Sequence, residues 1–406
     1  MATILNLTSF DAALKVKYPS MAIKNMVYKN NPFLALVAKS ENQRGKHVIV
    51  PVHYGVPMGR SATFTTAGSN KYSSAVTAFE MVRVSNYGRA DIDNQTLEAA
   101  MGDGNAFMEA AAFEIDGVLH SLGRDLAHDL FSDGFGWRGR IGSKSGALIT
   151  LSNISDIVNF EVGMVLNCTT TRNSTAHSGN LTVTAVDRDA GTVNLKTSSG
   201  GASWVSPRYL HVQGDAAVAS TKRKLQGLAA WLPSTAPSSG EAFNGVDRSK
   251  DPTRLAGLRV DGTGQTAVEA LIKAGAALWR EGGRASHFFC NPSHEADICK
   301  ALQGQVVYDT VKASDAEVSF DAIKVRTPGG AVKVVSDPNC PTGVGYLVDL
   351  ATWKLGSIGG APKILMTDGI RVLRNSATDS VEVRCGYYAT FYCTNPGFNA
   401  RVSLDT

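Results

Sequence analysis

Apolar residues recur at helical spacing over residues 105–132, the clearest pattern in the chain. A stripe that repeats every three or four residues marks one face of an α-helix. Gly102 and Gly104 predict a break from a shorter helix near 94–100, and Gly134 predicts the end of the long one. Such a helix would be about 42 Å long, enough to act as a spine between regions. The stripe consists of Met108, Ala112, Ile115, Leu119, Leu122, Leu126 and Leu130.

Two segments rich in Val and Ile, 46–54 and 76–84, predict β-strands. Residues 55–75 between them have the composition of a loop, so the pair predicts a long protruding hairpin. A two-stranded hairpin is marginally stable in water, and this one has too few apolar residues for a core of its own. We therefore expect it to rest on another molecule; the alternative is a mobile surface loop. Its candidate contact residues are Pro57, Arg60, Phe64, Lys71 and Tyr72.

Residues 140–215 are rich in Ser, Thr, Asn, Gly and Val and predict an independent small β-domain resembling a barrel. The strand candidates are ALITL, GMVLN, NLTVTAV, GTVNLKT and RYLHV. GFGWRG at 134–139 has the spelling of a dinucleotide motif, but it follows a helix instead of a strand. Its glycines are therefore expected to release the chain into the β-domain. GSKSG at 142–146 lacks the spacing of a phosphate loop and predicts a turn.

Residues 225–262 are loop-rich, and α/β material follows. Residues 263–283 predict a helix with Ala267, Leu271, Ala274 and Leu278 on one side. A buried strand at 285–290 leads to Asn291 as a helix N-cap and Pro292 as the first helical residue. The remaining strand predictions are a hairpin at 324–335 turning at Pro328-Gly329-Gly330, a strand at 345–350, a strand at 380–393, and a turn at Pro396-Gly397.

Residues 1–45 carry dispersed apolar and aromatic anchors without a persistent repeat, which favours an extended arm with short helical pieces. A flexible terminus is the alternative. The N-terminus lacks the basic start and apolar stretch of a signal peptide. Since no apolar run approaches the length that spans a bilayer, we expect a cytoplasmic chain without membrane contact.

Composition narrows the function. A chain of 406 residues predicts two or three structural units. Forty basic against 36 acidic residues is too even for a chain devoted to wrapping nucleic acid. Lys222, Arg223 and Lys224 form the sharpest basic cluster, expected as a solvated surface, with contact to DNA phosphates as the second interpretation. Six cysteines without a CxxC pair predict buried thiols, not bridges.

No constellation predicts catalysis, a cofactor or a metal. His287, Cys290, His294 and Cys299 have the ligand types of zinc. Strand alternation and the following helix aim them apart, so we expect a packed strand–helix joint. His120 and His128 lie near three aspartates of the long helix, Asp116, Asp125 and Asp129, and predict a charge network on the helix face. With no GxSxG elbow and no HExxH helix, we do not expect an enzyme.

The order of the segments is similar to that of the tailed-phage major capsid proteins with the Hong Kong 97-like fold. GNAFMEAAAFEIDGVLHSLGRDLAHDLFSDGFG resembles the family's spine helix, and LQGLAAWL with NGVDRS resembles its loop into the axial domain. HFFCNPSHEADICKAL resembles the axial strand, turn and helix. GYLVDLATWKL and VEVRCGYYATFYCTNPGFNARV resemble the closing strands. Residues 140–215 are similar to small β-domains inserted in some members.

The resemblance implies an α+β capsid fold with an inserted small β-barrel-like domain. The implied parts are an N-terminal arm (1–45), an extended loop hairpin (46–84), a peripheral domain with the spine helix (85–136), the inserted β-domain (137–215), an axial domain (216–365) and peripheral return strands (366–406).

The resemblance further implies a homo-oligomer of hexamers and pentamers that tiles an icosahedral head around double-stranded DNA. The DNA would be contacted non-specifically. Shells would assemble in the bacterial host cytoplasm and end in the virion. Only a short segment precedes the first strand, so a separate scaffolding protein is expected, with a portal. Some members form Lys–Asn cross-links; Lys71 is a candidate donor, but no matching acceptor is evident and no cross-link is predicted. The alternatives are another virion structural protein, such as a decoration or tail component, and a hydrolase.

Overall fold

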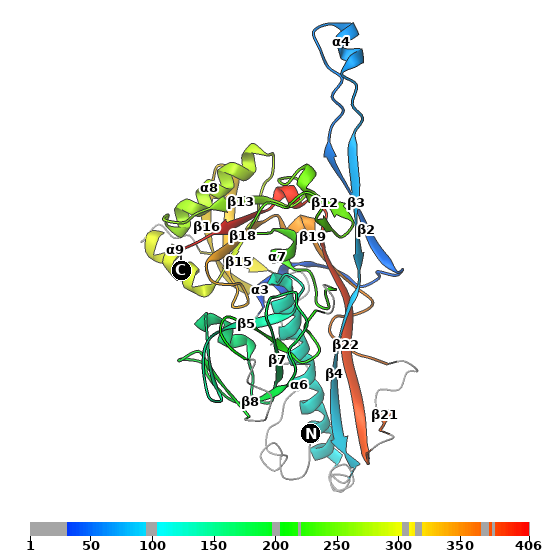
Figure 1. The fold of residues 1–406 in the computed structure, drawn as a ribbon, viewed down its shortest axis with the longest axis vertical. Helices are drawn as coiled ribbons and strands as arrows, with labels where there is room; N and C mark the ends of the chain where they lie inside the picture. Colours follow the sequence, from blue (N-terminus) through cyan, green and yellow to red (C-terminus); the bar gives the residue numbers. More distant parts are fainter. Residues whose placement is uncertain are drawn as a thin grey trace.

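The molecule is elongated, with a compact α/β body, a β-barrel beside it and a long hairpin projecting away from both (Figure 1). This computed structural model describes residues 31–94, 104–196, 204–217, 221–302, 308–312, 319–366, 373–375 and 378–405. Side chains are not described at 104–113, 308–312 and 319–322. The fold is mixed α+β, as the sequence predicts.

A seven-stranded mixed sheet forms the body. Its strands run in the order β13 (Leu258–Asp261), β23 (Ala400–Ser403), β18 (Val344–Val348), β14 (His287–Cys290), β17 (Gly330–Ser336), β16 (Ser319–Thr327) and β15 (Tyr308–Lys312). Helices α8 (Ala267–Arg280) and α9 (Pro292–Leu302) accompany it. Leu271, Ala274 and Leu278 of α8 are buried in its core, as their spacing predicts. Thr266 and Glu269 close a capping box at the start of α8.

A second, six-stranded sheet is built on one long strand, β22 (Ser380–Cys393). β4 (Val84–Asp93) pairs with one edge of β22. The other edge pairs with β19 (Trp353–Ser357), β20 (Lys363–Ile364) and β21 (Leu373–Arg374), and β1 (Ala38–Ser40) lies parallel to β19. The long helix α6 (Gly104–Phe131) packs against β4 and β22. Because β22 is buried on both faces, most of its positions are apolar instead of alternating.

The predicted small β-domain is a closed six-stranded barrel, in the order β10 (Tyr209–Val212), β5 (Trp137–Ser145), β6 (Leu148–Leu151), β9 (Thr192–Leu195), β8 (Leu181–Asp187) and β7 (Val165–Thr169). A 3-10 helix, η1 (Ile154–Asn159), contacts β5, β6 and β9. Phe160 and Trp204 are fully buried within its separate core. Closure of the barrel pairs every strand on both edges.

The projecting hairpin consists of β2 (His47–Gly55) and β3 (Ala75–Val82), with the short helix α4 (Phe64–Ser69) at its tip. The remaining elements are α3 (Pro32–Leu36), α7 (Leu228–Trp231), β11 (Ala242–Phe243), β12 (Val246–Asp247), η3 (Arg248–Lys250), η4 (Leu350–Thr352) and η5 (Pro396–Phe398).

Several sequence predictions need correction. Five of the six barrel strands were predicted, but β5 was missed because its polar sequence, WRGRIGSKS, resembles a loop. Residues 142–145 of the predicted GSKSG turn belong to that strand, and only Gly146 has a positive φ, of 60°. The helix at the hairpin tip was also unexpected. The short helix predicted near 94–100 lies almost wholly outside the described residues.

The predicted arm is shorter than residues 1–45. Phe33 is fully buried and packs on Phe131 and Phe289, with ring centroids 5.1 and 4.8 Å apart. Its backbone N–H donates to Asp337, 304 residues away in sequence. Residues 31–45 therefore belong to the body, and the part of the predicted arm before residue 31 lies outside the described residues.

Candidate functional site

The root of the hairpin is anchored in the body by one apolar face. Phe79 is fully buried, and its ring lies 5.0 Å from Trp231 and 6.2 Å from Phe243. Val50 and Met81 are buried beside it in the same core. Arg254 donates to the carbonyl of Tyr54 at 2.7 Å. The strands therefore leave the body in a fixed direction, because alternate side chains on one face are held.

The tip of the hairpin contacts no other part of the described chain through a buried side chain. Helix α4 has no buried residue, and the Phe64 side chain is 96% exposed. Tyr72 and Met58 are also exposed, as are the remaining predicted contact residues, Pro57, Arg60 and Lys71. Exposed aromatic side chains on a projecting element are typical of a contact with another molecule, because burying them releases ordered water.

The apolar stripe of α6 faces the six-stranded sheet. Leu122, Leu126 and Leu130 are buried in the central core, while Ile115 and Leu119 are partly buried against it. The side chain of Met108 is not among those described. Gly88 of β4 permits the close approach: a Cβ there would lie 2.5 Å from the Cγ1 of Val118.

The barrel is tied to α6 at its neck, where the chain enters and leaves it. Arg138 of β5 lies 2.9 Å from Asp125 of α6. Lys224, after the exit, lies 3.0 Å from Asp215 and 3.8 Å from Asp125. The side chains of Arg138 and Lys224 are almost fully buried, so their charges depend on these carboxylates.

In this neck cluster, the opposite charges shift one another's pKa values. Burial alone would raise the pKa of Asp125, but Arg138 and Lys224 outweigh it and lower that pKa. Burial would likewise lower the pKa of Lys224, but Asp129 and Asp215 outweigh it and raise that pKa. The charge network predicted on the face of α6 is present at Asp125 and Asp129, and this face is turned into the neck, where Asp129 is fully buried.

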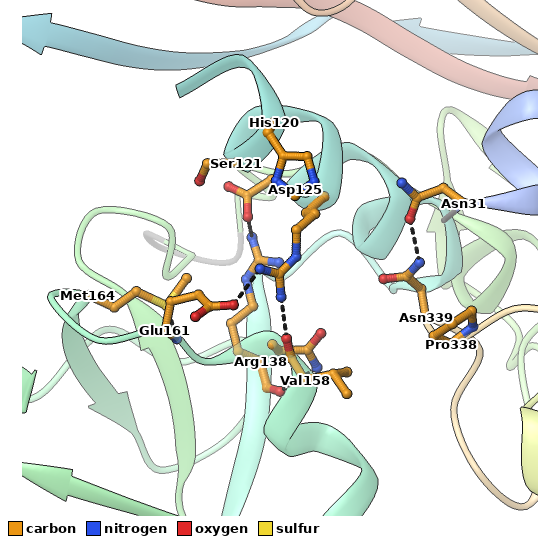
Figure 2. A pocket seen from close by; sticks show the side chains of 12 residues that line it. Asn31, His120, Ser121, Asp125, Arg138, Val158, Glu161, Met164, Pro338 and Asn339 are labelled. Carbon is orange, nitrogen blue, oxygen red and sulfur yellow. Dashed lines mark hydrogen bonds and ion pairs between the residues drawn. The ribbon is translucent and has the colours of Figure 1, made fainter. Parts of the chain in front are cut away.

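A cleft of about 290 Å³ opens between α6, the barrel and the loop at 338–339 (Figure 2). Arg124 spans it, pairing with Glu161 and donating to the carbonyl of Val158 at 2.6 Å. On the far side the amide of Asn339 donates to Asn31 at 2.9 Å. Polar residues on both sides of this cleft are therefore paired across it or beside it, as in a joint between parts.

The basic cluster at 222–224 splits into three environments. Arg223 is exposed, and Lys222 is half-buried over the rings of Phe135 and Phe243. Lys224 is 3% exposed and engaged in the neck cluster. The interpretation of all three as DNA-facing is therefore wrong for Lys224.

The residues considered for zinc do not converge. His294 accepts from the backbone N–H of Gly343 at 2.9 Å, and His287 bonds to Ser286. Among the described residues, no group of three or more His, Cys, Asp or Glu side chains is placed to hold a metal ion. The six cysteines are free, and all but Cys299 are buried, as predicted. No helix in the described part of the chain is both long enough and apolar enough for a bilayer crossing.

Comparison with known proteins identifies the class. Residues 208–365 match the family model of the SU10 major capsid protein. The solved capsid asymmetric unit of cyanophage A-1(L) has the same fold, with a TM-score of 0.56 at 12% identity over 92% of each chain. Over residues 208–365 the chain is therefore similar to a phage major capsid protein, and its fold is that of a solved phage capsid structure.

Two further capsid structures align over the whole chain at lower similarity. The capsid of Myoviridae phage XM1 has a TM-score of 0.46 at 9% identity, over 100% of this chain and 99% of that chain. The structure from Mycobacterium phage Cain has a TM-score of 0.42 at 12% identity, over 100% of this chain and 99% of that chain. No protein with a curated description matches the sequence.

Proposed function

We propose that this chain is a phage major capsid protein, and that it assembles as hexamers and pentamers into an icosahedral head that encloses phage double-stranded DNA. The observation that carries the proposal is the projecting hairpin, whose tip exposes Phe64 almost completely while its root is fixed in the core. An interface repeated by closed symmetry gains most from a rigid element that reaches a neighbouring subunit.

The parts of the molecule receive corresponding roles. Residues 46–84 act as the extended loop, with Pro57, Arg60, Phe64, Lys71 and Tyr72 on the neighbour. Residues 85–136 and 366–406 form the peripheral domain, with α6 as its spine. Residues 216–365 form the axial domain around the local symmetry axes, and 137–215 form the inserted β-domain. Residues before 31 act as the arm.

The same proposal includes the partners. Subunits assemble in the host cytoplasm with a separate scaffolding protein and a portal, and packaged DNA is contacted non-specifically. The near balance of 40 basic and 36 acidic residues fits an interior that tolerates DNA without binding it tightly.

Deletion of Arg60 to Lys71, with a glycine–serine link in their place, tests the hairpin. We expect shells to disappear in negative-stain images and light scattering while the thermal unfolding temperature stays the same, because no α4 side chain is buried. Phe64→Ser should weaken assembly in the same direction. Ile154→Ser, at another exposed apolar position on the barrel, is the matched control and should assemble normally. Normal shells from the deletion variant would refute the proposal.

A further inference from the structure

One edge of strand β4 is unpaired. β4 pairs with β22 along ten residues on one side, and within the described ranges no strand pairs with its other side. A free edge presents a row of backbone N–H and C=O groups that can pair with another extended chain. The tip of the hairpin, with α4, lies far from β4 (Figure 1).

Residues 84–87 of β4 line an open groove, where the N–H of Tyr87 already donates to the side chain of Asn86 at 3.1 Å. Residues 84–87 form one wall, and residues 213–215 and 222–224 at the barrel neck form the other, around about 490 Å³. A second hollow of about 420 Å³ continues along β3 at 80–82 and shares Arg83 and Lys222 with the first. The groove therefore follows the strand direction for several residues, as an added strand requires.

The groove is lined by more cationic than anionic side chains: Arg83, Lys222, Arg223 and Lys224 against Asp215. Lys222 Nζ lies 5.2 Å from the Phe135 ring centroid and 5.1 Å from that of Phe243, and no carboxylate among the described residues forms an ion pair with it. Burial lowers the pKa of Lys222, with Asp133 and Glu241 opposing the shift from a distance. Arg223 and Arg83 are held only by backbone carbonyls, those of Gly214 and Gln43.

Residues 1–30 and the hairpin tip of this chain have the wrong charge to fill the groove. Residues 1–30 contain four lysines and one aspartate, and the hairpin tip at 56–74 contains Arg60 and Lys71 without an acidic residue. Like charges across an interface are unfavourable. A nucleic acid would satisfy the cations but not the strand edge, which hydrogen-bonds to peptide groups.

We propose that the groove between β4 and the barrel neck binds an extended acidic segment of a second protein. The segment pairs with the free edge of β4 and places its carboxylates on Lys222 and Arg223.

The probe is a fluorescent decapeptide that alternates glutamate with valine, measured by anisotropy against the full-length protein. We expect saturable binding that weakens with salt, and no binding of the twin peptide with lysine in place of glutamate. Methylating alternate backbone nitrogens of the glutamate peptide should weaken binding about tenfold or more, because the strand hydrogen bonds are lost. This control leaves the protein unchanged.

Substitutions in the protein test where the peptide binds. Lys222→Gln and Arg223→Gln should each weaken binding of the glutamate peptide about tenfold. Lys300→Gln, which removes an exposed cation on distant α9, should not change it. Three results would each overturn the proposal. They are no binding of the glutamate peptide up to about 1 mM, equal binding of the methylated peptide, and no effect of Lys222→Gln. Displacement of the peptide by an oligothymidylate of higher affinity would overturn it in favour of nucleic acid.

Discussion

At the residue scale, the decisive groups are charges buried at the neck of the barrel. Arg138, Lys224, Asp125 and Asp215 come from three separated segments, and their opposite charges lie close together inside the protein. Breaking such a buried pair leaves an uncompensated charge, which costs more than the pair itself contributes. The neck is therefore a place where single substitutions have large effects.

Asp125→Asn should lower the free energy of unfolding by about 3–5 kcal/mol, because Arg138 loses its nearest carboxylate inside the protein. Urea unfolding followed by tryptophan fluorescence measures the change. Asp116→Asn, on the same helix, is the control: burial raises the pKa of Asp116, so removing its charge should not destabilise. Equal stability of the two variants would contradict a structural role for the neck cluster.

Asp156 makes stability depend on pH. Burial raises its pKa from an ordinary value of 3.8 to about 7, with Arg172 opposing the shift. The folded state therefore binds more protons than the unfolded state between these values, and stability falls as pH rises toward 7. We expect Asp156→Asn to raise Tm by about 2–4 °C at pH 8, and to raise it by less at pH 5, where the folded carboxyl is still protonated. A difference that is the same at both pH values would contradict this assignment.

At the element scale, α6 and the six-stranded sheet are held together by the complementary packing of their surfaces. The apolar stripe of α6 was predicted from its spacing, and its last three leucines are buried as expected. What the spacing does not show is the partner surface. Glycine at position 88 lets β4 approach the helix, and that contact is visible only when both elements are in place.

Two glycine substitutions should therefore act in opposite directions. Gly88→Ala places a Cβ against Val118 and should destabilise by about 1–3 kcal/mol. Gly117→Ala, on the exposed side of α6, meets no atom within 4 Å and should stabilise by about 0.5–1 kcal/mol through helix propensity. Denaturant midpoints measure both. A loss of stability in Gly117→Ala would mean that the outer side of α6 is covered.

At the scale of the whole molecule, the barrel is a unit with its own core. Its cluster, which includes Phe160 and Trp204, is separate from the two clusters of the body. The chain enters and leaves the barrel at the neck, so the rest of the fold does not depend on segments that pass through the barrel.

Residues 133–222 should therefore fold alone as a monomer, though marginally, because a unit of this size buries a small core. Dispersed amide signals in an NMR spectrum of the isolated segment would show this. The control is the segment of residues 225–302, which has a similar length but contains only part of the seven-stranded sheet. Its spectrum should be collapsed. Collapsed signals from the barrel segment would mean that the neck cluster is required for its folding.

The sequence by itself determined the elements whose pattern is local: the α6 stripe, the capped helix at 292–302, five barrel strands and the hairpin. Their order was enough to indicate the capsid fold. Only the tertiary structure decided what depends on distant segments. It buried Lys224 but left Arg223 exposed, drew Phe33 into the core, and left one edge of β4 unpaired within the described residues. Periodicity records which side of an element is apolar, but burial and pairing depend on which neighbours arrive.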